Sequence, residues 1–186
     1  KNTKLDGSAH LLLYGYGSYG SSMSPGFSST RLSLINRDII WVTAHIRGGM
    51  ERGMKWWKEG KLLNKKNSFK DYIAVAKFLI EKKYTSNKKI IGMGGSAGGL
   101  LMGAVVNQAP ELFLGIIMAV PFVDSLTTNL DHTLPLTVGE FEEFGNAKKN
   151  KEHFDYIYSY APYNNIKKMD YPHMLITTSL SDNRVL

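Results

Sequence analysis

The chain has 186 residues, of which 43% are hydrophobic, a net charge of +7 and no cysteine. This length suits one globular domain, and no apolar run reaches the roughly 20 residues of a membrane-spanning helix, so we expect no membrane partner. The lack of cysteine excludes disulfides and thiolate metal sites and fits a reducing compartment, so we expect a cytoplasmic protein.

Apolar runs that alternate with helical patterns define the expected elements. We predict strands at 10–15, 39–45, 89–94, 115–120 and 173–180. Several are apolar at consecutive positions, as in strands covered on both faces. The clearest helix is predicted over 68–84, with Ser68 as its N-cap and Asp71 completing a capping-box-like start. The long aromatic segment 122–165 is predicted to be functional. The alternation predicts an α/β fold with a mostly parallel sheet and helices on both faces.

Lysine clusters at 58–61, 65–66 and 148–151 contribute much of the positive charge. They lack the interleaved aromatic residues and arginines of a nucleic-acid-binding surface. We therefore interpret them as solvated loops and helix faces, and expect no nucleic-acid partner.

The stretch Gly94-Gly95-Ser96-Ala97-Gly98-Gly99 lies between a predicted strand and an apolar helical run at 100–106. A small-residue turn in this position is the sequence form of the nucleophile elbow of α/β-hydrolases, with Ser96 exposed above the sheet. The alternative is a glycine-rich turn with a capping serine. The additional glycines, Gly94 and Gly99, indicate a close approach of backbone or substrate.

A nucleophilic serine needs a histidine base oriented by a carboxylate, and α/β-hydrolases present serine, acid and histidine in that chain order. Asp182 and Asp124 each follow a predicted strand; we favour Asp182, which follows the later strand, although either could simply start a loop or cap a helix. No histidine follows Asp182 in the chain. The spacing of the histidines along the sequence suggests no metal site. Either the chain stops before its histidine, which we favour, or it is not a serine hydrolase. The five histidines are His10, His45, His132, His153 and His173.

Serine hydrolases also need hydrogen-bond donors for the oxyanion that forms during the reaction. The backbone N–H of Ala97, directly after Ser96, supplies one donor. The second could come from residues 14–20, which follow the first strand and combine tyrosines with flexible glycines. From spacing alone, a turn with core tyrosines fits this segment equally well.

Several motifs, in order along nearly the whole chain, resemble the peptidase domain of the prolyl oligopeptidase family and, within it, the oligopeptidase B subgroup. They are residues 14–20 (YGYGSYG), 31–34 (RLSL), 45–49 (HIRGG), 94–99 (GGSAGG), 121–124 (PFVD), 135–140 (PLTVGE) and 145–146 (GN). The resemblance implies Ser96 as the nucleophile and Asp182 as the acid that orients the histidine. It implies that the Tyr16 hydroxyl and the Ala97 N–H form the oxyanion hole.

The resemblance also implies a substrate. Glu140 and Glu142 match the paired acids that receive an Arg or Lys side chain, and Arg184 matches the arginine that holds a substrate carbonyl. The implied activity is a serine-type endopeptidase that cleaves short peptides after Arg or Lys through a covalent acyl-enzyme, without cofactor or metal. The alternatives are a post-proline peptidase or esterase of the same fold, or a catalytically dead fragment without its base.

The sequence also departs from the family pattern. Ser24 and Gly26 stand where many bacterial members have acids, which argues against a preference for paired basic residues. The family's N-terminal β-propeller and C-terminal histidine loop are not found in residues 1–186. We therefore expect a partial α/β-hydrolase peptidase domain, incomplete at its C-terminal end and inactive alone, whose intramolecular partner in the intact protein is the propeller.

Overall fold

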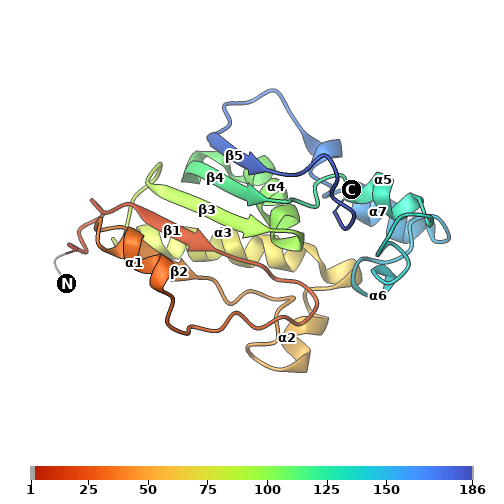
Figure 1. Cartoon of the computed structure of the whole chain (residues 1–186), viewed down its shortest axis with the longest axis horizontal. Helices are drawn as coiled ribbons and strands as arrows, with labels where there is room; N and C mark the ends of the chain where they lie inside the picture. Colours follow the sequence, from red (N-terminus) through yellow and green to blue (C-terminus); the bar gives the residue numbers. More distant parts are fainter. Residues whose placement is uncertain (1–2, 186) are drawn as a thin grey trace.

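A five-stranded parallel sheet lies at the centre of the structure, a computed structural model that describes residues 3–185 (Figure 1). The spatial order is β2-β1-β3-β4-β5, and all neighbouring pairs are parallel. The strands are β1 (Leu11–Tyr14), β2 (Ile40–Thr43), β3 (Ile90–Gly95), β4 (Phe113–Ala119) and β5 (His173–Thr177). All five predicted strands are present, with shifted ends, and the α/β-hydrolase prediction is confirmed.

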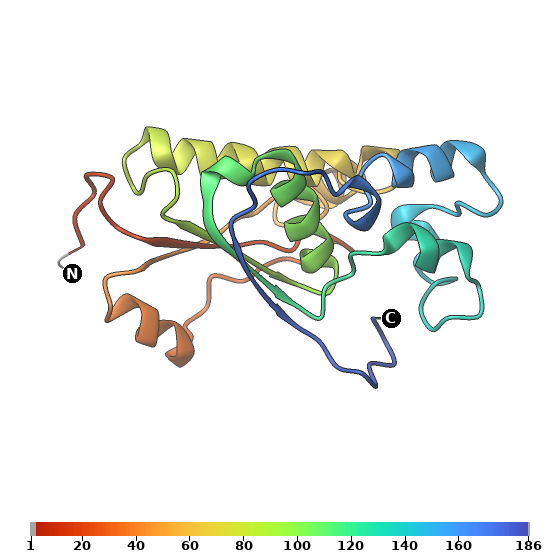
Figure 2. The same cartoon turned by 90° about the horizontal axis from the view of Figure 1, so that it is seen from above.

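Helices cover both faces of this sheet. Figure 2 shows α3 and α4 on one face and α1 on the other, so the fold has three layers. The α-helices are α1 (Ser29–Ile35), α2 (Met54–Lys58), α3 (Lys66–Glu81), α4 (Ala97–Gln108), α5 (Ser125–Leu130), α6 (Phe141–Phe144) and α7 (Lys151–Tyr158). Short 3-10 helices are η1 (Leu62–Asn64), η2 (Pro110–Leu112) and η3 (Tyr163–Asn165).

The core forms around α4. Every residue from 97 to 106 is buried, because this helix lies between α3 and the strands β3 and β4. A helix enclosed on all sides is apolar all round, which explains its lack of an amphipathic pattern. The buried Tyr72 on α3 connects the layers, since its hydroxyl donates a 2.6 Å hydrogen bond to the Leu13 carbonyl of β1.

The start of α3 corrects the predicted helix cap. The helix begins at Lys66, two residues before Ser68, and its N-cap position is Lys65. The buried Ser68 hydroxyl donates instead to the Arg47 carbonyl at 2.6 Å. Asp71 accepts hydrogen bonds from the Arg47 backbone N–H and guanidinium. The capping-box prediction was wrong because both side chains bind the segment after β2.

The loops that follow the strands gather at one edge of the sheet. Parallel strands bring their carboxyl ends together, and open α/β sheets bind ligands outside those ends. Helices α5, α6 and α7, from the long segment 122–165, lie at this same edge (Figure 1). None of the helices in residues 3–185 has both the length and the apolar character needed to cross a bilayer.

Candidate active site

Ser96 occupies a sharp turn between β3 and α4. Its backbone angles, φ 54° and ψ −118°, lie in a region that costs a non-glycine residue about 1–3 kcal/mol. Backbone hydrogen bonds hold the turn: the Ser96 N–H donates to the Ala119 carbonyl at 2.9 Å, and the Ser96 carbonyl accepts from Gly99 at 2.8 Å, Phe122 at 3.0 Å and Leu100 at 3.2 Å. The residue is therefore forced into the strained conformation typical of a nucleophile elbow.

The glycines around Ser96 are required by close backbone contacts. A Cβ atom on Gly94 would overlap the Gly98 carbonyl, and one on Gly99 would overlap the Pro121 Cα. Ser96 stands at the N-cap position of α4, yet its side chain makes no capping hydrogen bond. The geometry therefore does not support the alternative of a capping serine, and the hydroxyl stays available for other chemistry.

Tyr16 lies beside this turn. A Cβ on Gly98 would come 3.3 Å from the Tyr16 Cδ2 atom, so the ring lies against the first turn of α4. Burial raises the pKa of the Tyr16 hydroxyl, the nearby Tyr14, Glu140 and Glu143 add to the rise, and the nearby Ser96 side chain opposes it. A phenol with a raised pKa keeps its proton, so the Tyr16 hydroxyl stays able to donate a hydrogen bond.

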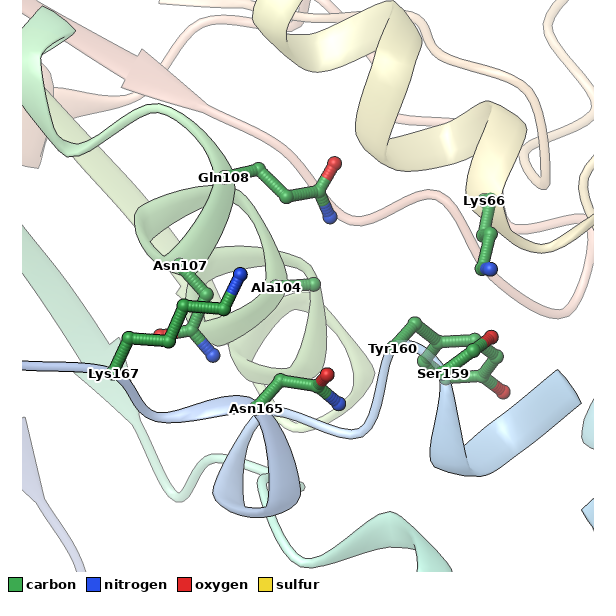
Figure 3. Close-up of a pocket in the computed structure, with 8 residues that line it drawn as sticks. All are labelled: Lys66, Ala104, Asn107, Gln108, Ser159, Tyr160, Asn165 and Lys167. Atoms are coloured by element: carbon green, nitrogen blue, oxygen red, sulfur yellow. The ribbon is translucent and has the colours of Figure 1, made fainter. Parts of the chain in front are cut away.

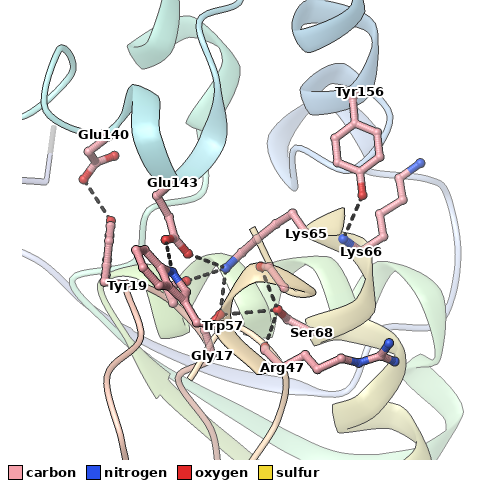
Figure 4. Close-up of polar contacts among 12 residues, drawn as sticks. Gly17, Tyr19, Arg47, Trp57, Lys65, Lys66, Ser68, Glu140, Glu143 and Tyr156 are labelled. Atoms are coloured by element: carbon pink, nitrogen blue, oxygen red, sulfur yellow. Dashed lines mark hydrogen bonds and ion pairs between the residues drawn. The ribbon is translucent and has the colours of Figure 1, made fainter. Parts of the chain in front are cut away.

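Tyr19 connects this loop to the acidic segment before α6. Its hydroxyl donates a 2.9 Å hydrogen bond to Glu140 Oε1 (Figure 4). Its ring centroid lies 6.2 Å from that of Tyr16. Burial raises the pKa of Glu140, the hydrogen bond from Tyr19 opposes this shift, and the charge of Glu143 adds to it. Ser96, Tyr16, Tyr19 and Glu140 therefore form a continuous series of neighbours.

Glu142 and Glu143 point to different surroundings. Glu142 is 78% exposed and lies 3.2 Å from the Lys61 ammonium. Glu143 is buried, and it accepts a 2.9 Å hydrogen bond from the Trp57 indole. Because Glu140 and Glu142 are two residues apart at the start of a helix, their side chains diverge. No described contact links Glu142 to Glu140.

The two acids that follow strands have different settings. Asp182 Oδ1 accepts 2.9 Å hydrogen bonds from the Val185 and Arg184 backbone N–H groups, and these bonds lower its pKa and favour the carboxylate. Asp124 caps α5 by accepting from the Thr127 N–H at 3.4 Å. Asp124 therefore has the helix-capping role that was the alternative to a catalytic one.

The remaining predicted groups make few contacts. The Arg184 side chain is exposed in the loop after β5. Within residues 3–185, no histidine is hydrogen-bonded to Ser96 or Asp182; the His45 ring bonds the Met23 carbonyl, and His153 accepts from the Asn146 N–H. The described part of the chain therefore brings together a serine, a tyrosine hydroxyl and an acidic side chain, and places no histidine in hydrogen-bond contact with that serine.

A buried ion pair that the sequence did not predict lies beside this site. Lys65 and Glu143 have side chains only 1% and 4% exposed, and Lys65 Nζ lies 3.5 Å from Glu143 Oε1 (Figure 4). The prediction that the lysine clusters are solvated was wrong at Lys65, although Lys148 and Lys149 are exposed. No periodic signal could have found the pair, since 78 residues separate its members.

A hollow of about 250 Å³ lies at the end of α4 that is remote from Ser96 (Figure 3). In it the Asn107 amide binds the Pro162 carbonyl and the Tyr171 hydroxyl, and Asn165 binds the Ala161 carbonyl, while the buried Tyr160 hydroxyl has no described partner. It contains none of the predicted site residues. Among residues 3–185, no group of three His, Asp or Glu side chains is arranged to hold a metal ion.

The parallel sheet, the strained serine turn and the polar loops at its carboxyl edge define an α/β-hydrolase catalytic domain. Residues 25–186 match the prolyl oligopeptidase family, and the chain therefore belongs to this family of serine peptidases.

Known relatives agree with this assignment. The chain is 53% identical to Protease 2 of Moraxella lacunata, over 97% of its own length and 26% of that protein. It is 49% identical to dipeptidyl aminopeptidase BI of Pseudoxanthomonas mexicana, over 100% and 25% of the two lengths. The structure of oligopeptidase B from Leishmania major superposes with a TM-score of 0.96 at 45% identity, covering all of this chain and 26% of that one. The chain thus spans about a quarter of these relatives.

Proposed function

We propose that the intact protein is a serine endopeptidase that cleaves short peptides on the C-terminal side of Arg or Lys. The observation that carries this proposal is that the Ser96 turn, Tyr16, Tyr19 and Glu140 are successive neighbours. It joins a strained serine to a partly buried carboxylate, which suits a reaction centre with an adjoining cation pocket.

The chemistry follows from these groups. Ser96 Oγ attacks the scissile carbonyl, and a histidine from outside residues 1–186 takes its proton while Asp182 orients that histidine. The developing oxyanion accepts hydrogen bonds from the Tyr16 hydroxyl and the Ala97 N–H. The amine leaves with the proton from the histidine, and water then hydrolyses the acyl-enzyme. Residues 1–186 alone are proposed to be inactive, because they lack this base.

The acidic side chains account for the substrate class. The Glu140 carboxylate receives the guanidinium or ammonium group, held in place by the Tyr19 hydroxyl. Glu142 is proposed as the second acid; its carboxylate is largely exposed, so its contact with Lys61 is weak and can exchange for a substrate cation. Arg184 is proposed to hold a substrate carbonyl. A propeller in the rest of the intact protein is proposed to restrict entry to short peptides.

The test uses the intact protein with matched arginyl and neutral peptide substrates. Ser96→Ala is expected to abolish turnover of both, and unchanged turnover rejects the assignment. Glu140→Gln is expected to lower kcat/KM for arginyl substrates about 10- to 100-fold, as for loss of a charge-assisted contact, with a small effect on neutral ones. Glu142→Gln, measured separately, shows whether the second acid contributes; an equal loss on neutral substrates argues against either pocket role.

The similarity to dipeptidyl aminopeptidase BI favours a second candidate, release of dipeptides from free N-termini. The two activities differ in their need for a substrate amino terminus. Cleavage of an N-terminally blocked arginyl peptide supports the endopeptidase. Cleavage of the unblocked peptide only supports a dipeptidyl aminopeptidase. Preference for a neutral or prolyl peptide would instead indicate a post-proline peptidase, and preference for a simple ester would indicate an esterase.

A further inference from the structure

The buried pair of Lys65 and Glu143 is fully hydrogen-bonded. The Lys65 ammonium donates to the Gly17 carbonyl at 2.7 Å, to Ser18 Oγ at 2.5 Å and to Glu143 Oε1 at 3.5 Å. The other carboxylate oxygen accepts from the Trp57 indole. All three ammonium protons and both carboxylate oxygens therefore have partners.

These contacts join four separate segments (Figure 4). Gly17 and Ser18 belong to the loop after β1, Trp57 to α2 and Glu143 to α6, while Lys65 precedes α3. Burial lowers the pKa of Lys65 to about 8, and Glu143 opposes this shift, so the ammonium is still charged at neutral pH.

Stability alone does not account for such a pair. Removing two charges from water costs about as much as their attraction returns, and well-packed apolar residues are often equally stable. What the pair offers is a fixed geometry, since an ammonium with three acceptors holds each of them in one place.

The segments held by the pair are those of the proposed reaction centre. Gly17 and Ser18 directly follow Tyr16, the proposed oxyanion donor. Glu143 lies one helical turn after Glu140, and its N–H donates to the Glu140 carbonyl at 3.0 Å. The only side-chain hydrogen bond described between the same two segments outside the pair is that from Tyr19 to Glu140.

We propose that Lys65 and Glu143 are positioning residues. They hold the loop after β1, which carries Tyr16, in a fixed position relative to the start of α6, which carries Glu140. No hydrogen bond is described between the pair and Ser96, and the pair acts through Gly17, Ser18 and the α6 turn. The inference rests on the proposed function for its substrates, but its structural basis is independent of which peptide is cleaved.

The test compares three variants of the intact protein: Glu143→Gln, Lys65→Met and the double variant. Each single change leaves a buried group without its partner and is expected to lower the thermal midpoint. The double variant removes both charges and is expected to recover most of that midpoint. Its kcat is nevertheless expected to stay about 10- to 100-fold low on a small neutral ester, because Tyr16 is no longer held.

A second readout addresses Glu140. The ratio of kcat/KM for arginyl over neutral substrates is expected to fall in the double variant, with KM for the arginyl substrate raised. Asp155→Asn, which removes the exposed pair with Lys151, is the control and should change neither the ester kcat nor this ratio. The proposal would be overturned if the double variant recovered the ester kcat and the arginyl-over-neutral ratio together with the thermal midpoint. The pair would then be purely structural.

The neutral ester separates this inference from the proposed function. Turnover that is abolished by Ser96→Ala reports the oxyanion geometry whatever the peptide specificity. If arginyl preference is absent in the unsubstituted protein, the proposed function fails, and the ester kcat of the double variant still decides whether the pair positions Tyr16.

Discussion

Within residues 3–185, the hydrogen bond from the Tyr19 hydroxyl is the only one described between the loop 15–20 and the Glu140 side chain. Tyr19 itself has a φ of 59°, a left-handed conformation that is uncommon for a bulky residue. Its ring packs edge-on against Phe144 of α6, with centroids 5.9 Å apart. Both observations indicate that the residue is held in place by its surroundings to present the hydroxyl to the carboxylate.

Replacing Tyr19 with Phe removes this hydrogen bond and keeps the ring. A hydrogen bond to a charged group contributes about 1.5–3 kcal/mol, so KM for arginyl substrates should rise roughly 10-fold or more. Turnover of a neutral substrate should change little, because Tyr16 and Ser96 are untouched. Steady-state kinetics on the two substrates measure the difference; an equal loss on both would show that Tyr19 supports the catalytic loop and not the pocket.

The pH dependence of substrate preference follows from Glu140. Burial raises the pKa of this carboxyl, so it takes up its proton at a higher pH than an ordinary glutamate. A protonated Glu140 does not attract a cation, and the ratio of kcat/KM for arginyl over neutral substrates should fall as the solution becomes mildly acidic. The neutral substrate cancels titrations that affect both reactions.

Tyr19→Phe provides the comparison for this profile. The hydrogen bond from Tyr19 lowers the pKa of Glu140, so its loss should move the decline in preference to higher pH. A profile that is the same in both proteins would show that Glu140 is not the group that titrates. Glu140→Gln should remove the pH dependence of the ratio.

At the scale of elements, the turn between β3 and α4 depends on how closely α4 approaches the loop after β4. Gly99 lies where a side chain would overlap the Pro121 backbone, which cannot move as easily as a flexible side chain. The same loop donates the Phe122 N–H to the Ser96 carbonyl. Separation of the two elements would therefore also disturb the strained serine.

Gly99→Ala is expected to destabilise the intact protein by about 1–3 kcal/mol, as for other overpacked sites, and to lower turnover strongly. Gly26→Ala is the control, since its added methyl group would meet only the Ser24 hydroxyl at 3.5 Å. Thermal unfolding and steady-state turnover measure the two effects. Normal turnover in Gly99→Ala would mean that the elbow does not depend on this contact.

The elements were predictable where local patterns determine them. Consecutive apolar residues such as Leu11 to Leu13 predicted a buried strand, and the glycines around Ser96 predicted the turn, because both signals lie within a few residues. The cap at Ser68 was wrong because its hydroxyl has a tertiary partner, Arg47, that helix spacing cannot reveal. The partners of Lys65 and Tyr19 lie 78 and 121 residues away, so these contacts required the fold.

At the scale of the whole molecule, β5 forms one edge of the sheet and is exposed along its entire length. Its apolar residues Met174, Leu175 and Ile176 are 41%, 57% and 53% exposed. An exposed apolar edge strand offers unpaired N–H and C=O groups to any other chain. The loop that carries Asp182 follows this same strand.

The 186-residue chain produced alone is therefore expected to self-associate through β5. Light scattering coupled to size exclusion should show mass that increases with concentration. Leu175→Lys should reduce the association, because a charged residue on an edge strand opposes strand pairing. Phe78→Lys is the matched control: Phe78 is 52% exposed on α3, away from any sheet edge, so its replacement should leave the association unchanged. A monomer at all concentrations, or equal effects of the two substitutions, would contradict association through this strand.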